Sequence, residues 1–571
     1  MGPSPRRRLA VIAVTGFAAA IAVAGLSATA FADDDGGLPH AVTEQKFNVV
    51  SAPPAADGAD FSLGGVKQLS GKICGPMAGP GSDPRNVNTD CDESVGIVAP
   101  HNETSIAVNP RDPNNIIGGV NDYQLTLSNG GTVKETVLSR AHVSFNGGQT
   151  WAEYAVPFKS YTATGDPGIA FDADGTAYYS TLGFLFSQGN SPGETNADVL
   201  VSHSTDGGQN WTVPSRVGQG SGSLGSVSTA SLDKPYITAW GHGNALVAWT
   251  NFVQGPKGSF ISSPLMDSVT HDGGVTWTQP TPISGSAAFC VGSSGGNACD
   301  VDQGAVPVFS GGHVYIAFEN FSFAPSGNDQ YLVVQVSPAT GQLAAGPFRV
   351  GEVVDGFTAY PISVAGRQTY QDSQFRSWSL GNITVDPLNP SHLAVIWSDM
   401  RNSPPLVNLD PYAVVTNSDV IVSQSFNGGL TWSPPQALMI PHDQFQPWGA
   451  YDATGRLNIG YFDRFFDPAN HQFDYSLSTE GAPGSLLFPA IPNRLTTVPS
   501  QPTMNDRWFS GIPVNPAFPH ATQFLGDYSN IAADPRGGVV AYWTDLRNTV
   551  SFAGRTGFGE DAFFARSRGE G

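Results

Sequence analysis

Basic residues are scarce in this sequence. Lysine and arginine together number 27, against 48 aspartate and glutamate residues, and the formal net charge is -21 at pH 7. A surface of this sign repels the phosphates of nucleic acids and the headgroups of anionic lipids. We therefore expect no nucleic-acid partner, and the acid excess suits a protein that stays soluble outside the cell.

Sustained helical periodicity is also missing, whereas glycine (67 residues) and proline (44 residues) are abundant. These two residue types interrupt helices and favour turns between short strands. The length of 571 residues would allow several domains. The composition instead predicts one large all-β domain.

Cysteine is rare, with four residues in the whole chain. In an exported chain an even number of cysteines predicts disulfides. Of the three possible pairings, Cys74 with Cys91 and Cys290 with Cys299 needs the least rearrangement of the chain. Metal ligation by these cysteines is disfavoured, because their spacings are wide and no histidine pair accompanies them.

The N-terminus predicts export. Residues 6–8 are arginines, residues 9–26 are almost all apolar or small, and residues 30–32 read Ala-Phe-Ala, the form of a cleavage site. We assign residues 1–32 to a signal peptide and expect a secreted, extracellular monomer without a stable membrane span. A membrane anchor is the alternative, but the apolar run is marginal in length and lacks a charged stop. The arginines leave the Sec and twin-arginine routes both open.

One short pattern occurs four times. It consists of Ser or Thr, any residue, Asn or Asp, Gly-Gly, two further residues and Trp, and it stands at residues 144–151, 204–211, 270–277 and 425–432. The Asn or Asp side chain can accept bonds from nearby backbone N–H groups, the glycines accept positive φ, and the indole packs against the sheet. The pattern therefore predicts hairpin turns that stabilise a fold and perform no chemistry.

Strands with alternating apolar positions precede these turns, and seven such units can be counted along the chain. Seven units of four antiparallel strands describe a β-propeller, with six blades as the alternative. We assign residues 33–100 to an N-terminal extension with a disulfide and a ring-closing strand, and residues 101–571 to the propeller. The last unit has no room for its fourth strand, so we expect residues 46–50 or 66–69 to supply it.

The four turns resemble Asp boxes, and together with the leader and the strand pattern they make residues 100–571 similar to the sialidase superfamily of Asp-box (BNR-repeat) propellers. In that family an arginine triad holds the sialic acid carboxylate, a tyrosine activated by a glutamate attacks the anomeric carbon, and an aspartate is the acid and base. The chain departs from the family in having no Phe/Tyr-Arg-Ile-Pro motif in the first blade. Seven blades and the Asn-Pro-Arg-Asp-Pro-Asn-Asn of residues 109–115 are more similar to sortilin-type and xyloglucanase-type propellers, which bind peptides or cleave neutral glucans.

The resemblance also implies which face is functional, because the boxes of such propellers lie on the opposite face. Residues that enter first strands and leave second strands then surround the axial mouth, and Tyr528 matches the family nucleophile in position. The predicted catalytic residues are Tyr528, Glu319, Asp166 and Asp302, and the predicted substrate-binding residues are Arg401, Arg464, Arg547, Asp233, Lys234, Glu103 and Asp122. The repetition of Asp and Arg at the strand ends has a second interpretation, as ion pairs between blades.

These features predict a secreted, sialidase-like glycoside hydrolase that acts on extracellular glycans, with an exo-α-sialidase as its specific form. The alternative is a non-catalytic propeller that binds carbohydrate or protein, and a lyase that uses Tyr528 with a basic group is a third interpretation. We expect no cofactor. The acid excess suits calcium, but no Asp-x-Asp-x-Asp-Gly loop is present, so the sequence assigns no metal site.

Overall fold

The computed structural model describes residues 61–63, 66–68, 71–127, 133–186, 194–221, 229–255, 260–322, 328–356, 359–363, 367–501, 524–552 and 555–567. The predicted signal peptide and the segment 46–50 lie outside these residues. No helix in the described part of the chain is long and apolar enough to cross a membrane.

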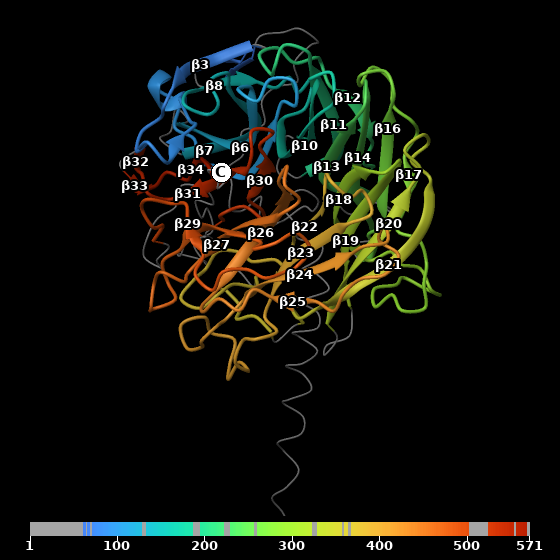
Figure 1. The fold of residues 1–571 in the computed structure, drawn as a ribbon. Coiled ribbons are helices and arrows are strands. Elements are labelled where there is room, and N and C mark those ends of the chain that lie inside the picture. The colour runs from blue at the N-terminus through green and yellow to red at the C-terminus, as the bar shows by residue number, and fades with distance from the viewer. Residues whose placement is uncertain are drawn as a thin grey trace, which may run out of the picture.

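Seven blades of antiparallel strands form the molecule, and the blue first blade lies beside the red last blade (Figure 1). This confirms the predicted seven-bladed, all-β propeller. The first blade contains, from its innermost strand outward, β5 (His101–Val108), β6 (Ile116–Leu127), β7 (Val133–Ser144), β8 (Trp151–Ala155) and an added β3 (Gly71–Met77). The second contains β9 (Ala163–Phe171), β10 (Ala177–Phe186), β11 (Glu194–Ser204) and β12 (Ser215–Gly218).

The third and fourth blades follow the same order. The third contains β13 (Thr229–Trp240), β14 (Asn244–Gln254), β16 (Leu265–Thr270) and β17 (Thr281–Pro282), with the short β15 (Phe260–Ser262) paired to β14. The fourth contains β18 (Asp302–Ser310), β19 (His313–Asn320), β20 (Asp329–Val336) and β21 (Leu343–Val353).

The last three blades complete the ring. The fifth contains β22 (Asn382–Val385), β23 (Leu393–Asp399), β24 (Asp419–Ser425) and β25 (Gln436–Ala437), and the sixth β26 (Gln444–Tyr451), β27 (Leu457–Asp463), β28 (Asp474–Thr479) and β29 (Asn493–Arg494). The seventh contains β30 (Asn530–Ala533), β31 (Val539–Asp545), β34 (Asp561–Arg566) and β4 (Val87–Asn88). Outside the blades lie one 3-10 turn (Asp92–Val95) and the hairpins of β1 (Phe61–Leu63) with β2 (Val66–Gln68) and of β32 (Thr549–Phe552) with β33 (Arg555–Phe558).

The strand that completes the seventh blade differs from both predicted segments. It is β4, whose Val87 and Asn88 pair with Phe564 and Phe563 of β34. Residues 66–68 instead form β2, which pairs with β1, and residues 46–50 lie outside the described residues. A strand of two residues shows no alternation of apolar and polar positions, so periodicity cannot reveal it.

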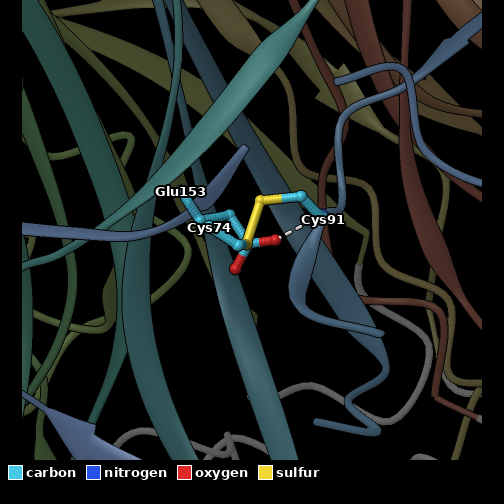
Figure 2. Close-up of side chains that lie close together, drawn as sticks. All are labelled: Cys74, Cys91 and Glu153. Carbon is cyan, nitrogen blue, oxygen red and sulfur yellow. Dashed lines mark hydrogen bonds between the residues drawn. A yellow bond between two sulfur atoms is a disulfide. The ribbon is translucent and has the colours of Figure 1, made fainter. Parts of the chain in front are cut away.

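Two disulfides have the predicted pairing, Cys74 with Cys91 and Cys290 with Cys299. The first joins β3 to the segment after β4. Figure 2 shows the Glu153 carboxylate of β8 beside it, accepting a bond of 2.5 Å from the Cys91 backbone N–H. This disulfide therefore ties the segment that closes the ring to the first blade.

The four Gly-Gly turns have the local bonding that the sequence predicts. In the first, Asn146 Oδ1 accepts bonds from the backbone N–H groups of Gln149 and Thr150 at 3.1 and 3.0 Å. Gly147 and Gly148 have φ of 73° and 89°, and the Trp151 indole N–H donates to the Gly148 carbonyl at 3.0 Å. This bonding occupies the box side chains and accounts for them without a catalytic role.

A recurring β-bulge on the innermost strand positions the candidate site. In five blades the pairing of first and second strand shifts register near its start, and the first bulged residue has positive φ. These residues, one from each blade, are Glu103, Asp166, Lys234, Gly304 and Gln446. A bulge re-aims a side chain, and glycine alone adopts this backbone conformation without strain.

Candidate active site

Three of the bulged residues meet a fourth charged residue at the centre of the ring. The Lys234 ammonium nitrogen lies 3.1 Å from Glu103 Oε1, 3.2 Å from Asp166 Oδ2 and 2.8 Å from Asp527 Oδ2. The four residues come from blades one, two, three and seven, and their side chains are at most 4% exposed. With Arg376 we call them the axial cluster.

Arg376 completes the axial cluster from the segment between the fourth and fifth blades. Its Nε donates to Asp527 Oδ1 at 2.8 Å, and its Nη2 donates to Asp527 Oδ2. The guanidinium lies 4.8 Å from the centre of the Phe524 ring. Its side chain is 11% exposed, so Arg376 is the member of the cluster that solvent reaches most easily.

Amide and carboxylate groups hold the bulges in place. Asn121 donates from Nδ2 to Glu103 Oε2 at 2.7 Å, and its Oδ1 accepts from the Asp166 backbone N–H at 2.9 Å. Asp233 accepts from the Lys234 backbone N–H at 2.9 Å and from Gln303 Nε2 at 2.7 Å. Asp233, predicted to bind substrate, therefore contacts the backbone of the cluster and orients Lys234.

Aromatic side chains form the next layer along the axis. The Tyr528 ring centre lies 5.5 Å from the Lys234 nitrogen and 5.3 Å from the Tyr236 ring, which in turn lies 5.5 Å from Trp448. Tyr236 and Trp448 also line an axial cavity of about 740 Å³, whose wall includes the turns at Asp386 and Asp452. The aromatic layer therefore adjoins both the charged cluster and this cavity.

Burial changes the proton affinity of the site. It raises the pKa of the Glu103 carboxyl well above its usual value, and the neighbouring Asp166 carboxylate adds to this rise while Lys234 opposes it. Burial, followed by the charge of Glu103, also raises the pKa of the Tyr528 hydroxyl well above its usual value. Glu103 can therefore keep a proton at a pH where an exposed glutamate is ionised, which is a property of a general acid.

The structure brings four of the predicted site residues together: Tyr528, Asp166, Glu103 and Lys234. Two residues of the cluster, Arg376 and Asp527, were not among the predicted site residues. Asp527 directly precedes the predicted nucleophile Tyr528, and this position in the sequence could have indicated that it belongs to the site. Arg376 lies outside any strand, and no sequence pattern marks it.

Three predicted acidic residues lie in other surroundings. Asp302 Oδ1 accepts a bond of 2.7 Å from Asn320, and Asp122 forms an ion pair of 2.9 Å with Arg140. Glu319 accepts a bond of 2.9 Å from the Trp378 indole and lies beside two further carboxyl groups. The partners of these three acids thus lie outside the axial cluster.

The three predicted substrate-binding arginines each bind a different aspartate. Arg547 pairs with Asp545 at 2.8 Å, Arg464 pairs with Asp443 at 3.0 Å, and Arg401 pairs with Asp399. Arg401 also donates to the Glu352 carbonyl of the fourth blade. Both members of each pair belong to one blade, so these are not the ion pairs between blades of the alternative interpretation, and a role in substrate binding stays a prediction.

Comparisons with known proteins identify no family for this chain. No protein-family model and no curated protein matches it. Among solved structures, a protein of unknown function from Dyadobacter fermentans DSM 18053 is similar at 9% identity and a TM-score of 0.40, over 86% of this chain and 100% of that one. An α-L-arabinanase from Penicillium chrysogenum is similar at 12% identity and a TM-score of 0.39, over 66% of this chain and 94% of that one. A mutant of the NanB sialidase from Streptococcus pneumoniae is similar at 9% identity and a TM-score of 0.39, over 80% of this chain and 82% of that one. Likeness at this level identifies neither a family nor an activity.

Proposed function

We propose that this protein is a secreted glycoside hydrolase that acts on extracellular glycans, with the axial cluster as its reactive centre. One observation carries the proposal: Glu103, Asp166 and Lys234 adopt φ of 52°, 58° and 50°, and their side chains converge. Left-handed backbone at a residue other than glycine costs about 1–3 kcal/mol and is concentrated at functional sites. Strain at three such positions, all carrying charge, favours a reactive centre.

The proposed roles follow from charge and position. Glu103 is the general acid, because its pKa is raised, and Asp166 is the second carboxylate. One oxygen of each lies 3.1 or 3.2 Å from the same lysine nitrogen, so the two oxygens can be no farther apart than the sum of these distances. Such a short separation suits a retaining mechanism, in which the second group attacks the sugar. Tyr528 is the alternative nucleophile, and it would need Glu103 as a base to take its proton, because burial and the charge of Glu103 raise its pKa.

Charge on the axis favours a neutral sugar over sialic acid. The axial cluster contains three carboxyl groups and two cations, and both cations already bind Asp527. A sialic acid carboxylate is best held by arginines that are free to form paired hydrogen bonds. The test therefore compares two classes of substrate: sialyl glycosides, which an exo-α-sialidase would cleave, and neutral α- and β-glycosides.

The leader sequence and the two disulfides support an extracellular site of action. Disulfides form and persist in oxidising compartments. The substrates to test are therefore glycans that occur outside cells.

The test measures hydrolysis of sialyl and neutral aryl glycosides by the mature protein and its Glu103→Gln, Asp166→Asn and Tyr528→Phe variants. General acid catalysis contributes roughly 10²–10⁴-fold, so Glu103→Gln should lower kcat by at least about 10²-fold. Asp112→Asn, which changes an exposed carboxylate in the turn after β5, serves as the control and should leave kcat unchanged. Melting curves of all variants verify folding. Equal kcat in Glu103→Gln and wild type, or no turnover of any glycoside, contradicts the proposal.

A second candidate is a non-catalytic propeller that binds carbohydrate or protein. It is favoured by the burial of the axial cluster, whose carboxylates are at most 4% exposed. Glycan-array binding that Tyr528→Phe leaves unchanged, together with no turnover in either form, would support the binder.

A further inference from the structure

A second group of three acidic residues lies at one end of the fourth blade. Glu319 is near the end of β19, Asp329 begins β20, and Asp355 follows β21. One carboxylate oxygen of each lies within 4.8 Å of those of the other two. The residues are 0%, 7% and 5% exposed, and we call them the blade-4 cluster.

In the part of the chain that the structure describes, the blade-4 cluster lacks a compensating positive charge. The charged groups that most affect its three carboxyls are all other carboxyls: the members themselves and Asp399, which is already paired with Arg401. Within the described residues, no lysine, arginine or histidine forms an ion pair with a member. Burying ionised carboxylates without a countercharge is so unfavourable that they must take up a proton or bind a cation.

Hydrogen bonds orient the cluster and leave two of its oxygens without an N–H or hydroxyl donor. The Trp378 indole donates to Glu319 Oε2 at 2.9 Å, and the Ser322 backbone N–H donates to Asp329 Oδ1 at 2.6 Å. Glu319 Oε1 and Asp355 Oδ1 are buried and accept no hydrogen bond from an N–H or hydroxyl group in the described part of the chain, and the Glu319 and Asp355 carboxyls can bond to each other only if one of them holds a proton. Buried polar atoms are nearly always paired, so these two oxygens themselves point to a ligand.

We propose that the blade-4 cluster binds a divalent cation of the calcium type. The donors are carboxylate oxygens alone, with neither imidazole nor thiolate, and hard cations select such a set. Calcium accepts six to eight oxygen ligands in irregular geometry, so water and backbone carbonyls can complete a site that three carboxylates begin. The site is separate from the axial cluster and does not depend on the proposed hydrolase activity.

Proton affinity agrees with this assignment. Burial and neighbouring carboxyls raise the pKa of Glu319 and Asp329 well above their usual values, and burial raises the pKa of Asp355 to about 6. Protons therefore compete with the cation for the same oxygens. Calcium should therefore bind more tightly as the pH rises.

The first experiment measures the melting temperature of the full mature chain at pH 7.5, after chelation and then with added calcium chloride. Calcium should raise the melting temperature of the wild type by about 2 °C or more, because a ligand that binds only the folded state stabilises it. Glu319→Gln should remove this rise. Glu352→Gln, an exposed glutamate on the neighbouring β21 that accepts from Asn328, should keep it.

The second experiment uses terbium, a luminescent ion with the same preference for oxygen ligands. Trp378 bonds directly to Glu319, so excitation of its indole should sensitise terbium emission. Added calcium should quench that emission, and Trp378→Phe should lower it while the calcium-induced rise in melting temperature persists.

Two results overturn the proposal: a melting temperature that calcium leaves unchanged in the wild type, or an equal calcium-induced rise in Glu319→Gln. In either case the three carboxyls share protons and hold no cation.

Discussion

The axial cluster and the blade-4 cluster each bury three carboxyl groups, but they balance the charge differently. In the axial cluster one lysine nitrogen lies within 3.2 Å of all three carboxylates. In the blade-4 cluster, the described residues supply no cation and two oxygens have no N–H or hydroxyl donor. Burial alone therefore does not define the role of a carboxyl group. What differs is whether the protein itself supplies the countercharge or leaves it to an external ion.

A third buried cluster is intermediate, because a titratable residue supplies part of its countercharge. His101 lies 3.3 Å from Asp90 and 3.8 Å from Asp92, and Asp122 pairs with Arg140. The cluster joins the segment after β4 to the first blade. Its charge balance should therefore depend on the protonation of His101.

Loss of the axial lysine should have the largest effect on stability. Lys234→Met leaves three buried carboxylates with Arg376 as their remaining cation, and removing one partner of a buried ion pair costs about 3–5 kcal/mol. Urea unfolding at pH 7.5 measures the change, and Lys72→Met, at an exposed lysine of β3, is the control. A loss below about 1 kcal/mol would mean that Lys234 does not balance the axial charge.

Loss of His101 should have a smaller effect that depends on pH. The charges of Asp90, Asp92 and Asp122 outweigh burial and raise its pKa well above 6.5. A raised pKa gives stability that is fully present below 6.5 and is lost as the pH rises through the folded-state pKa. His101→Gln should therefore cost about 1.5–3 kcal/mol at pH 6, which is the usual contribution of a hydrogen bond to a charged group, and less in alkaline solution.

Urea unfolding of wild type and His101→Gln between pH 6 and pH 10 measures this trend. The groups that face His101 include Glu153, whose pKa burial raises to about 7, so the variant must be compared with wild type at each pH. A difference that stays constant over this range contradicts a charged His101.

Removal of a carboxyl from the blade-4 cluster should have the smallest effect, and of opposite sign. With calcium chelated, Asp355→Asn should be more stable than the wild type by about 1–2 kcal/mol at pH 8. The rise in the pKa of Asp355 from 3.8 to about 6 corresponds to about 3 kcal/mol, and the buried amide of the variant offsets part of this gain. The raised pKa of Asp355, about 6, means that the wild type loses stability as the pH rises from about 4 through 6.

Melting curves of both forms in chelator at pH 4 and pH 8 test this expectation. The gain should vanish at pH 4 and should reverse when calcium is present at pH 8. A wild type that is more stable than Asp355→Asn in chelator at pH 8 would show that the carboxyl is already compensated.

The sequence predicts the propeller well because its fold depends on local turns. The Gly-Gly pairs and the following tryptophans repeat at fixed spacing, and each turn forms its bonds within a few residues. The ring-closing strand at Val87 and Asn88 was missed, because it is too short to show a period and its partner lies more than 470 residues away.

The candidate sites depend on long-range geometry and were predicted less completely. Asp166 and Lys234 were predicted to belong to the site, and both precede a proline at a bulge, as Gln446 does, but their convergence on one nitrogen atom could not be predicted. Arg376 reaches the axis from a segment without strands. Glu319, Asp329 and Asp355 are brought together by the pairing of blade-4 strands and share no motif.

A crystal structure of the protein grown with calcium would test the contrast between the two three-carboxyl clusters most directly. We predict one ion among Glu319, Asp329 and Asp355, with calcium–oxygen distances of about 2.3–2.6 Å, and no ion among Glu103, Asp166 and Asp527, where the Lys234 nitrogen occupies the centre. Carboxyl groups of the blade-4 cluster bonded to one another without an ion, at a pH above 7 in calcium, would contradict the account.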